Sequence, residues 1–245
     1  MIEQTIDIAT KDGATTTFIV HPERDGPHPV ILFLMDAPAI REELRDMARR
    51  IAAAGYYVML PNLYYRHDVM ELSHLPKLPE AAARARMFEY MDSLTIPMIM
   101  SDADALLDFA DRDPAAGKGR IATLGYCMSG QYAVNFAARY PERVGSAASI
   151  YGVRLVTDRS DSPHLAAQKA GGELYFACAE IDQYAPLEMV EALDHSLRTN
   201  RVNAELEIYP GVHHGFAFPQ RPAYDRAAAE RHWERLFSLW RRTIG

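Results

Sequence analysis

Short continuous runs of apolar residues alternate with helical segments along most of this 245-residue chain. Such runs are typical of parallel strands, because helices cover both faces of a parallel sheet and leave neither face to water. The strands expected after an amino-terminal hairpin of residues 4–9 and 15–21 are residues 30–35, 56–60, 120–125, 145–151, 174–179 and 204–209. The helices expected between and after them are residues 42–54, stretches within 80–110, 130–139, 187–198 and 223–242. This alternation predicts an α/β fold: a mainly parallel central sheet with helices on both faces.

The sequence favours a single domain over residues 1–245. No linker rich in Gly, Ser or Pro divides it, and it has no internal repeat. Residues 64–97 interrupt the strand and helix alternation. Open α/β sheets bind ligands beyond the carboxyl ends of their strands. We therefore expect this excursion to cover a site there.

Composition excludes several classes of function. The chain carries 26 Lys and Arg against 33 Asp and Glu, a formal net charge of −7, which disfavours nucleic acid as a partner. It has no secretion-signal pattern and no apolar run near the roughly 20 residues of a membrane span. We expect a cytoplasmic protein without membrane contact, monomeric or weakly homodimeric. The two cysteines do not have the spacing of zinc ligands, so we expect no metal. The chain also has no glycine-rich nucleotide-binding motif, so we expect no cofactor.

The most informative motif is Gly-Tyr-Cys-Met-Ser-Gly, which follows an apolar strand and precedes a helix. Small residues two positions before and after Cys127, here Gly125 and Ser129, permit the sharp turn that lifts a nucleophile above a sheet. A helix amino terminus beneath the side chain favours the reactive thiolate. The motif thus predicts a nucleophile elbow with cysteine, whereas an inert buried cysteine in a tight turn is the alternative.

Partners for this nucleophile follow two later strands. Asp182 comes directly after the strand expected at 174–179, and His214 follows the one expected at 204–209. Nucleophile, acid and histidine occur in this order in α/β-hydrolase triads, whereas an inert buried cysteine would require neither partner. We predict that His214 takes the Cys127 proton and that Asp182 orients His214.

Weaker assignments remain open for two of these roles. His213 could be the base, although the Gly215-Phe216 pair that follows His214 favours His214. Glu180 and Asp161 are alternative acids.

These residues give the chain a specific resemblance to the dienelactone hydrolase family of α/β-hydrolases, which implies an α/β-hydrolase fold. The matching pieces are residues 35–37, 61–66, the elbow around Cys127, 150–153, Asp182 with Tyr184 and Pro186, and 214–216. The resemblance identifies Cys127, Asp182 and His214 as the family's triad. It also implies an oxyanion site formed by the backbone N–H groups of Met128 and Ala37.

The chain departs from the family pattern in two places. Asp36 stands where the family usually has a glutamate that takes part in activating the thiol; its alternative role is to order its loop. Phe218 stands where an arginine would hold the substrate carboxylate, with Arg221 three residues later. The residues predicted to bind substrate are Arg84, Arg86 and Tyr90 in the excursion, and Tyr184 and Phe216 beside the triad.

The resemblance implies a hydrolase that cleaves a small lactone or ester by cysteine-based acyl transfer, with dienelactone converted to maleylacetate as the first expectation. A generalist carboxylesterase acting on other activated esters is the alternative. A non-catalytic or redox-sensing protein that binds a small molecule is a further alternative from another class.

Overall fold

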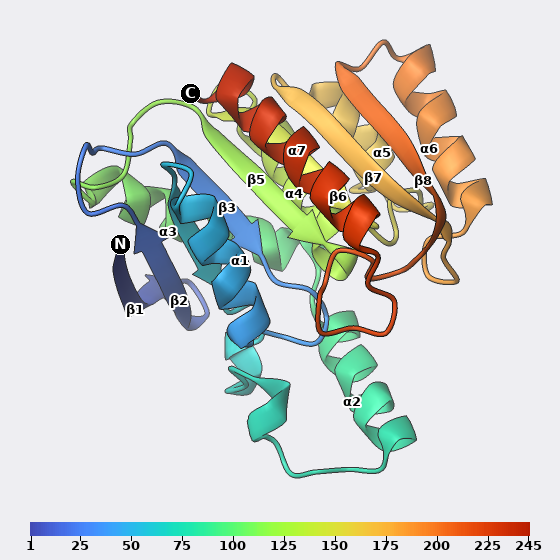
Figure 1. Cartoon of the computed structure of the whole chain (residues 1–245), viewed down its shortest axis with the longest axis horizontal. Helices are drawn as coiled ribbons and strands as arrows, with labels where there is room; N and C mark the ends of the chain where they lie inside the picture. The colour runs from blue at the N-terminus through green and yellow to red at the C-terminus, as the bar shows by residue number, and fades with distance from the viewer. The chain divides into compact units, whose positions relative to one another are not determined.

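A computed structural model describes residues 1–245, apart from the side chain of His74. The chain divides into two compact units, Met1–Lys118 and Gly119–Gly245, coloured from blue to green and from green to red in Figure 1. Each unit has its own buried core, and the single domain expected from the sequence stays a prediction. Among the helices of the described residues, none is long and apolar enough to cross a membrane.

The first unit contains the predicted amino-terminal hairpin. Strands β1 (Ile2–Thr10) and β2 (Gly13–His21) pair antiparallel, β2 pairs antiparallel with β4 (Tyr57–Pro61), and β4 pairs parallel with β3 (Val30–Leu34). Every residue of β3 and β4 is buried. Their continuous apolar sequence therefore reflects burial on both faces, as predicted.

Two helices cover the strands of this unit. Helix α1 (Glu42–Ala52) packs on β2 and β4, and α3 (Ile96–Arg112) packs on β1. The Thr95 side chain caps α3 by accepting a hydrogen bond from the Met98 N–H.

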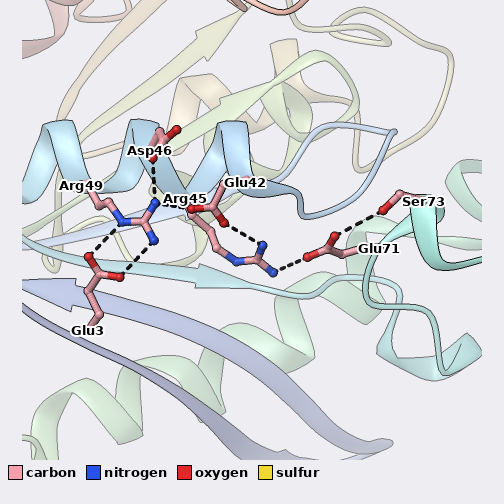
Figure 2. Close-up of polar contacts among 7 residues, drawn as sticks. All are labelled: Glu3, Glu42, Arg45, Asp46, Arg49, Glu71 and Ser73. Carbon is pink, nitrogen blue, oxygen red and sulfur yellow. Dashed lines mark hydrogen bonds and ion pairs between the residues drawn. The ribbon is translucent and has the colours of Figure 1, made fainter.

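Charged side chains on the exposed face of α1 form the network shown in Figure 2. Arg49 donates to Glu3 on β1 at 2.9 and 3.0 Å and to Asp46 at 2.7 Å. Arg45 forms ion pairs with Glu42 on the same helix and with Glu71 in the excursion of residues 64–97, so this face of α1 also contacts the excursion.

The excursion of the first unit consists of η1 (Tyr65–His67), η2 (Leu72–His74) and α2 (Glu80–Ser93). Helix α2 has one buried residue, Met91, and the helix extends away from the strands of its unit (Figure 1).

The second unit is built on four parallel strands in the order β5-β6-β7-β8. The strands are β5 (Ile121–Tyr126), β6 (Val144–Ile150), β7 (Glu173–Ile181) and β8 (Ala204–His213). The helices are η3 (Cys127–Ser129), α4 (Gly130–Arg139), α5 (Pro163–Ala166), η4 (Ala167–Lys169), α6 (Leu187–Thr199) and α7 (Arg226–Thr243). Helix α4 packs on β5 and β6, and α7 runs across the opposite face (Figure 1). The predicted α/β architecture with parallel strands is confirmed.

The carboxyl end of β8 lies further along the chain than the sequence predicts. The pair Pro210-Gly211 suggested the start of a loop, but β8 continues to His213, which pairs with Ile181 after a register shift. Such an irregularity accommodates the extra residues, and the Glu180 carboxylate accepts a hydrogen bond from the Gly211 N–H at 2.7 Å. The extension places His214 directly after a strand that is paired to its last residue.

Candidate active site

Cys127 occupies the turn between β5 and the helical segment of η3 and α4. Its φ angle is +52°, in the left-handed region, which costs a non-glycine residue about 1–3 kcal/mol. The preceding Tyr126 is extended, so the chain reverses sharply at the cysteine. Cys127 is partly exposed, and Val153 donates its N–H to the Cys127 carbonyl at 3.1 Å. This is the geometry of a nucleophile elbow.

Glycines allow the close packing on which this turn depends. A Cβ atom on Gly125 would overlap the carbonyl oxygen of Ser129, which explains the need for a small residue two positions before the cysteine. A second constraint lies at Gly130 and was not predicted from the sequence. A Cβ there would overlap the Ser149 hydroxyl and the Cα of Gly152, where α4 begins against the end of β6.

His214 and Asp182 form the most direct polar contact in the site. The His214 Nδ1 donates to Asp182 Oδ2 at 2.6 Å. The other oxygen, Oδ1, accepts the N–H groups of Tyr184 at 2.8 Å and Ala185 at 3.1 Å. The Asp182 side chain has no exposed surface and that of His214 is 14% exposed. Three hydrogen bonds therefore fix the carboxylate, which fixes the ring.

The surroundings of His214 favour its protonated form. Burial lowers the pKa of His214, but the hydrogen bonds to Asp182 and Cys127 and the negative charges of these partners outweigh burial and raise the pKa to about 9. A base with this affinity for a proton can accept one from a thiol. The structure thus brings Cys127, His214 and Asp182 together in one unit.

The other polar residues considered for these roles are engaged elsewhere. Glu180 binds the Gly211 N–H, and Asp161 pairs with Arg159 at 2.8 Å. His213 ends β8, whereas His214 faces Asp182.

Aromatic rings surround His214. Tyr184 meets the imidazole edge-to-face with ring centroids 5.0 Å apart, and the ring of Tyr151 lies at 4.9 Å. Phe216 is fully buried and packs edge-to-face on Tyr151 at 5.3 Å. Phe216, predicted to bind substrate, is therefore positioned to support Tyr151. Tyr151 lies within the family-matching residues 150–153, but its contact with His214 was not predicted from the sequence.

The residue that replaces the family's arginine cannot hold an anion. Phe218 is 1% exposed and packs against Tyr126 and Tyr151. Arg221 lies beside Gly215, the residue after His214: a Cβ on that glycine would be 3.3 Å from the Arg221 Cδ. Its guanidinium lies 5.3 Å from the centroid of Phe218.

Met128 lies on η3 directly after the cysteine, where the helical segment begins. Its side chain is buried and its carbonyl accepts a hydrogen bond from the Gln131 side chain at 2.9 Å. The amino end of a helical segment directs backbone N–H groups outward, so this position suits the predicted oxyanion donor.

Asp36 and Ala37 follow β3 in the first unit and are both buried. Arg41 donates to the two Asp36 oxygens at 2.6 and 3.3 Å and to Glu43 at 2.8 Å. Burial lowers the pKa of Arg41, and its carboxylate partners Asp36 and Glu43 more than reverse that effect. The ion pair supports the loop-ordering role of Asp36. The roles predicted for Asp36 in thiol activation and for Ala37 as an oxyanion donor stay predictions.

The substrate-binding residues predicted in the excursion lie on α2. Arg84 is exposed and stacks on Phe88, whereas Tyr90 packs against Tyr64 and His67. Arg84 and Arg86 line a hollow of about 320 Å³. The other residues that line it are Leu72, Leu75, Pro76, Leu78, Glu80, Ala83 and Met87. Substrate binding by these side chains stays a prediction.

Cys178 differs sharply from Cys127. It is 4% exposed within β7, and burial together with the charge of Asp182 raises the pKa of its thiol to about 12. It therefore behaves as an inert core residue. Within the described part of the chain, no three His, Cys, Asp or Glu side chains group as metal ligands would.

Comparison with solved structures establishes the fold class. A structure titled "Putative Dienelactone Hydrolase" from Klebsiella pneumoniae superimposes with a TM-score of 0.86, covering 98% of both chains at 22% identity. The protein has the α/β-hydrolase fold.

The family follows from the sequence comparison. Residues 15–244 match the model of the dienelactone hydrolase family, so the chain belongs to that family and is a carboxylic ester hydrolase. Relatives named "Putative carboxymethylenebutenolidase" include one from Methylorubrum extorquens, 27% identical over 98% of this chain and 81% of the relative. Another, from Escherichia coli K12, is 28% identical over 91% and 80%.

Proposed function

We propose that this protein hydrolyses a small lactone or activated ester through a Cys127 thioester, with dienelactone, converted to maleylacetate, as its substrate. The observation that carries the proposal is the array in which His214 hydrogen-bonds to Cys127 and donates to Asp182 at 2.6 Å. The relatives' printed names support the choice of substrate.

In the proposed reaction the Cys127 thiol transfers its proton to His214, and the thiolate sulfur attacks the ester carbonyl carbon. The resulting oxyanion accepts a hydrogen bond from the Met128 N–H. Collapse re-forms the carbonyl, breaks the C–O bond to the leaving group and leaves a thioester on Cys127. The leaving oxygen takes the proton from His214, which returns the imidazole to its neutral form. For a lactone this leaving group is an enolate that stays attached to the acyl chain. Water then gives a proton to His214 and attacks the thioester, and the departing thiolate regains its proton.

Asp182 acts through His214 in this scheme. Its negative charge stabilises the imidazolium that forms in both steps, and its hydrogen bond fixes which nitrogen of the ring faces the sulfur.

Arg221 is the proposed partner of the substrate carboxylate. It lies beside Gly215, adjacent to the base, and guanidinium binds carboxylate with two parallel hydrogen bonds. A second candidate function is a generalist carboxylesterase, which the buried apolar Phe218 favours.

Hydrolysis of cis-dienelactone beside a neutral aryl ester tests both candidates. We expect Cys127→Ala to abolish turnover of both, and Arg221→Met to raise KM about tenfold for the dienelactone alone, the loss of about 1.4 kcal/mol. The control is Arg198→Met on α6, because Arg198 is 80% exposed and pairs with Asp194 within its helix. Full turnover by Cys127→Ala would refute the mechanism, and preference of the wild type for the neutral ester would favour the generalist function.

A further inference from the structure

His232 on α7 is a buried polar residue for which the proposed reaction has no role. Its side chain has no exposed surface. A buried imidazole is costly unless its nitrogens find partners, and both of them do. Nδ1 contacts the carbonyl oxygen of Ala229, one turn earlier on the same helix, and Nε2 lies 3.0 Å from the Tyr126 hydroxyl.

The direction of these hydrogen bonds follows from their chemistry. A carbonyl oxygen only accepts, so Nδ1 must carry a proton. In the neutral ring Nε2 is then an acceptor, and the Tyr126 hydroxyl donates to it. The pair therefore fixes the distal end of the Tyr126 side chain in one orientation.

Tyr126 is the residue before the nucleophile. It ends β5 in an extended conformation, and the chain turns into the left-handed region at Cys127. Its ring is fully buried and packs against Phe218 at 5.2 Å and Tyr151 at 5.8 Å. A displacement of this ring would move the backbone that sets the direction of the Cys127 side chain.

The same aromatic cluster holds the base. Tyr151 contacts the His214 ring at 4.9 Å, and Phe216, two residues after His214, lies 5.3 Å from Tyr151 and 6.1 Å from His232. His232 thus contacts the segment before the nucleophile through a hydrogen bond and the segment after the base through a ring contact.

We infer that His232 is a positioning residue: through its hydrogen bond to Tyr126 it fixes the turn that carries Cys127 relative to the loop that carries His214. The inference rests on the proposed function. Reacting groups that are displaced by about 1 Å lose about a hundredfold in rate, so a fixed anchor in this cluster acts on the chemical step.

Stability alone does not require a polar pair at this place. Replacing both partners of a buried hydrogen bond by apolar groups of similar shape is nearly neutral for folding. The double variant Tyr126→Phe with His232→Leu therefore separates the two roles, because it removes the orientation together with both polar groups of the Tyr126–His232 hydrogen bond. His232→Gln is the conservative variant, since its amide oxygen can still accept from Tyr126.

The experiment measures kcat and KM for an aryl ester, the rate of Cys127 alkylation by iodoacetamide from pH 6 to 9, and urea unfolding. We expect Tyr126→Phe and the double variant to lower kcat about tenfold, to leave KM within twofold of the wild type and to change the pH profile of alkylation. We expect His232→Gln to keep most of the wild-type kcat. The control is Tyr175→Phe, which removes a buried hydroxyl from β7, where it contacts Tyr209 at 2.7 Å; its kcat should stay within twofold of the wild type.

If the double variant has the kcat and the alkylation rate of the wild type while Cys127→Ala is inactive, the positioning role is overturned and the proposed function stands. Turnover by Cys127→Ala would instead refute the proposed function. Alkylation needs no substrate, so it would still decide whether His232 and Tyr126 position the thiol.

Discussion

The substitution Asp182→Asn removes one negative charge from the candidate site and preserves its shape. The amide oxygen can still accept the backbone N–H groups of Tyr184 and Ala185, which now bind Oδ1. The amide nitrogen would then face His214 Nδ1, 2.6 Å from the present Oδ2. Because two donors cannot bond, the imidazole must give up this contact or change its tautomer.

The magnitude follows from the proton affinity of His214. A rise of its pKa from 6.5 to about 9 corresponds to about 3 kcal/mol in favour of the imidazolium. Burial opposes that rise and Cys127 adds to it, and both effects persist in the variant. If the imidazolium forms in the transition state, we expect kcat to fall by about a hundredfold or more.

The assay is steady-state hydrolysis of an aryl ester at pH 7, with urea unfolding measured on the same samples. Asp161→Asn is the matched control, since Asp161 pairs with Arg159 outside the triad. Glu180→Gln tests the other carboxylate near the end of β7. A folded Asp182→Asn enzyme that keeps more than a third of wild-type kcat would refute the reasoning, as would an equal loss in either of the other two variants.

Further predictions concern stability and thiol chemistry. Because the pKa of His214 is raised to about 9, its contribution of about 3 kcal/mol to the free energy of unfolding should be complete below pH 6.5 and disappear as pH rises to about 9. Urea unfolding of the wild type and of His214→Gln across this pH range checks this, and a difference in unfolding free energy that does not change with pH would contradict it. Gly130→Ala should lower the free energy of unfolding by about 1–3 kcal/mol, measured in urea, because the added methyl group overlaps atoms of the β6 end. Arg49→Met should cost about 1 kcal/mol in dilute buffer and less in 1 M NaCl, since it breaks the surface network of Figure 2; a loss that is independent of salt would argue for packing instead. Native protein should show one thiol that reacts with an aromatic disulfide reagent, and Cys127→Ala none until unfolded, because the pKa of Cys178 is about 12.

Much of the fold could be predicted from local sequence because burial leaves a direct pattern in it. The apolar runs that became β3, β4 and β5 are buried at every residue, and both ends of the helix Gly130–Arg139 were predicted to the residue. The end of β8 could not be predicted, since Pro210-Gly211 has the sequence of a turn. Its continuation depends on the neighbouring strand β7 and on Glu180, which lie about 30 residues earlier in the chain.

The sequence by itself determined the chemical inventory of the candidate site and the order of its parts. A cysteine between small residues after a buried strand, an acid after a later strand and a histidine after the last one are local patterns, and the topology of a parallel sheet brings strand ends to one edge. Sequence alone left Glu180 and Asp161 as possible acids, and only the tertiary structure placed Asp182 on His214.

The tertiary structure also decided the environment that sets reactivity. The contacts of Tyr151 with His214 and of His232 with Tyr126 join residues 63 and 106 positions apart. Neither contact has a local signature, because a tyrosine or histidine in an apolar stretch looks the same whether its polar atoms serve the core or a site. The proton affinity of His214 likewise arises from burial and from partners distant in the chain. Residue types are encoded locally, whereas desolvation and orientation are properties of the packed chain.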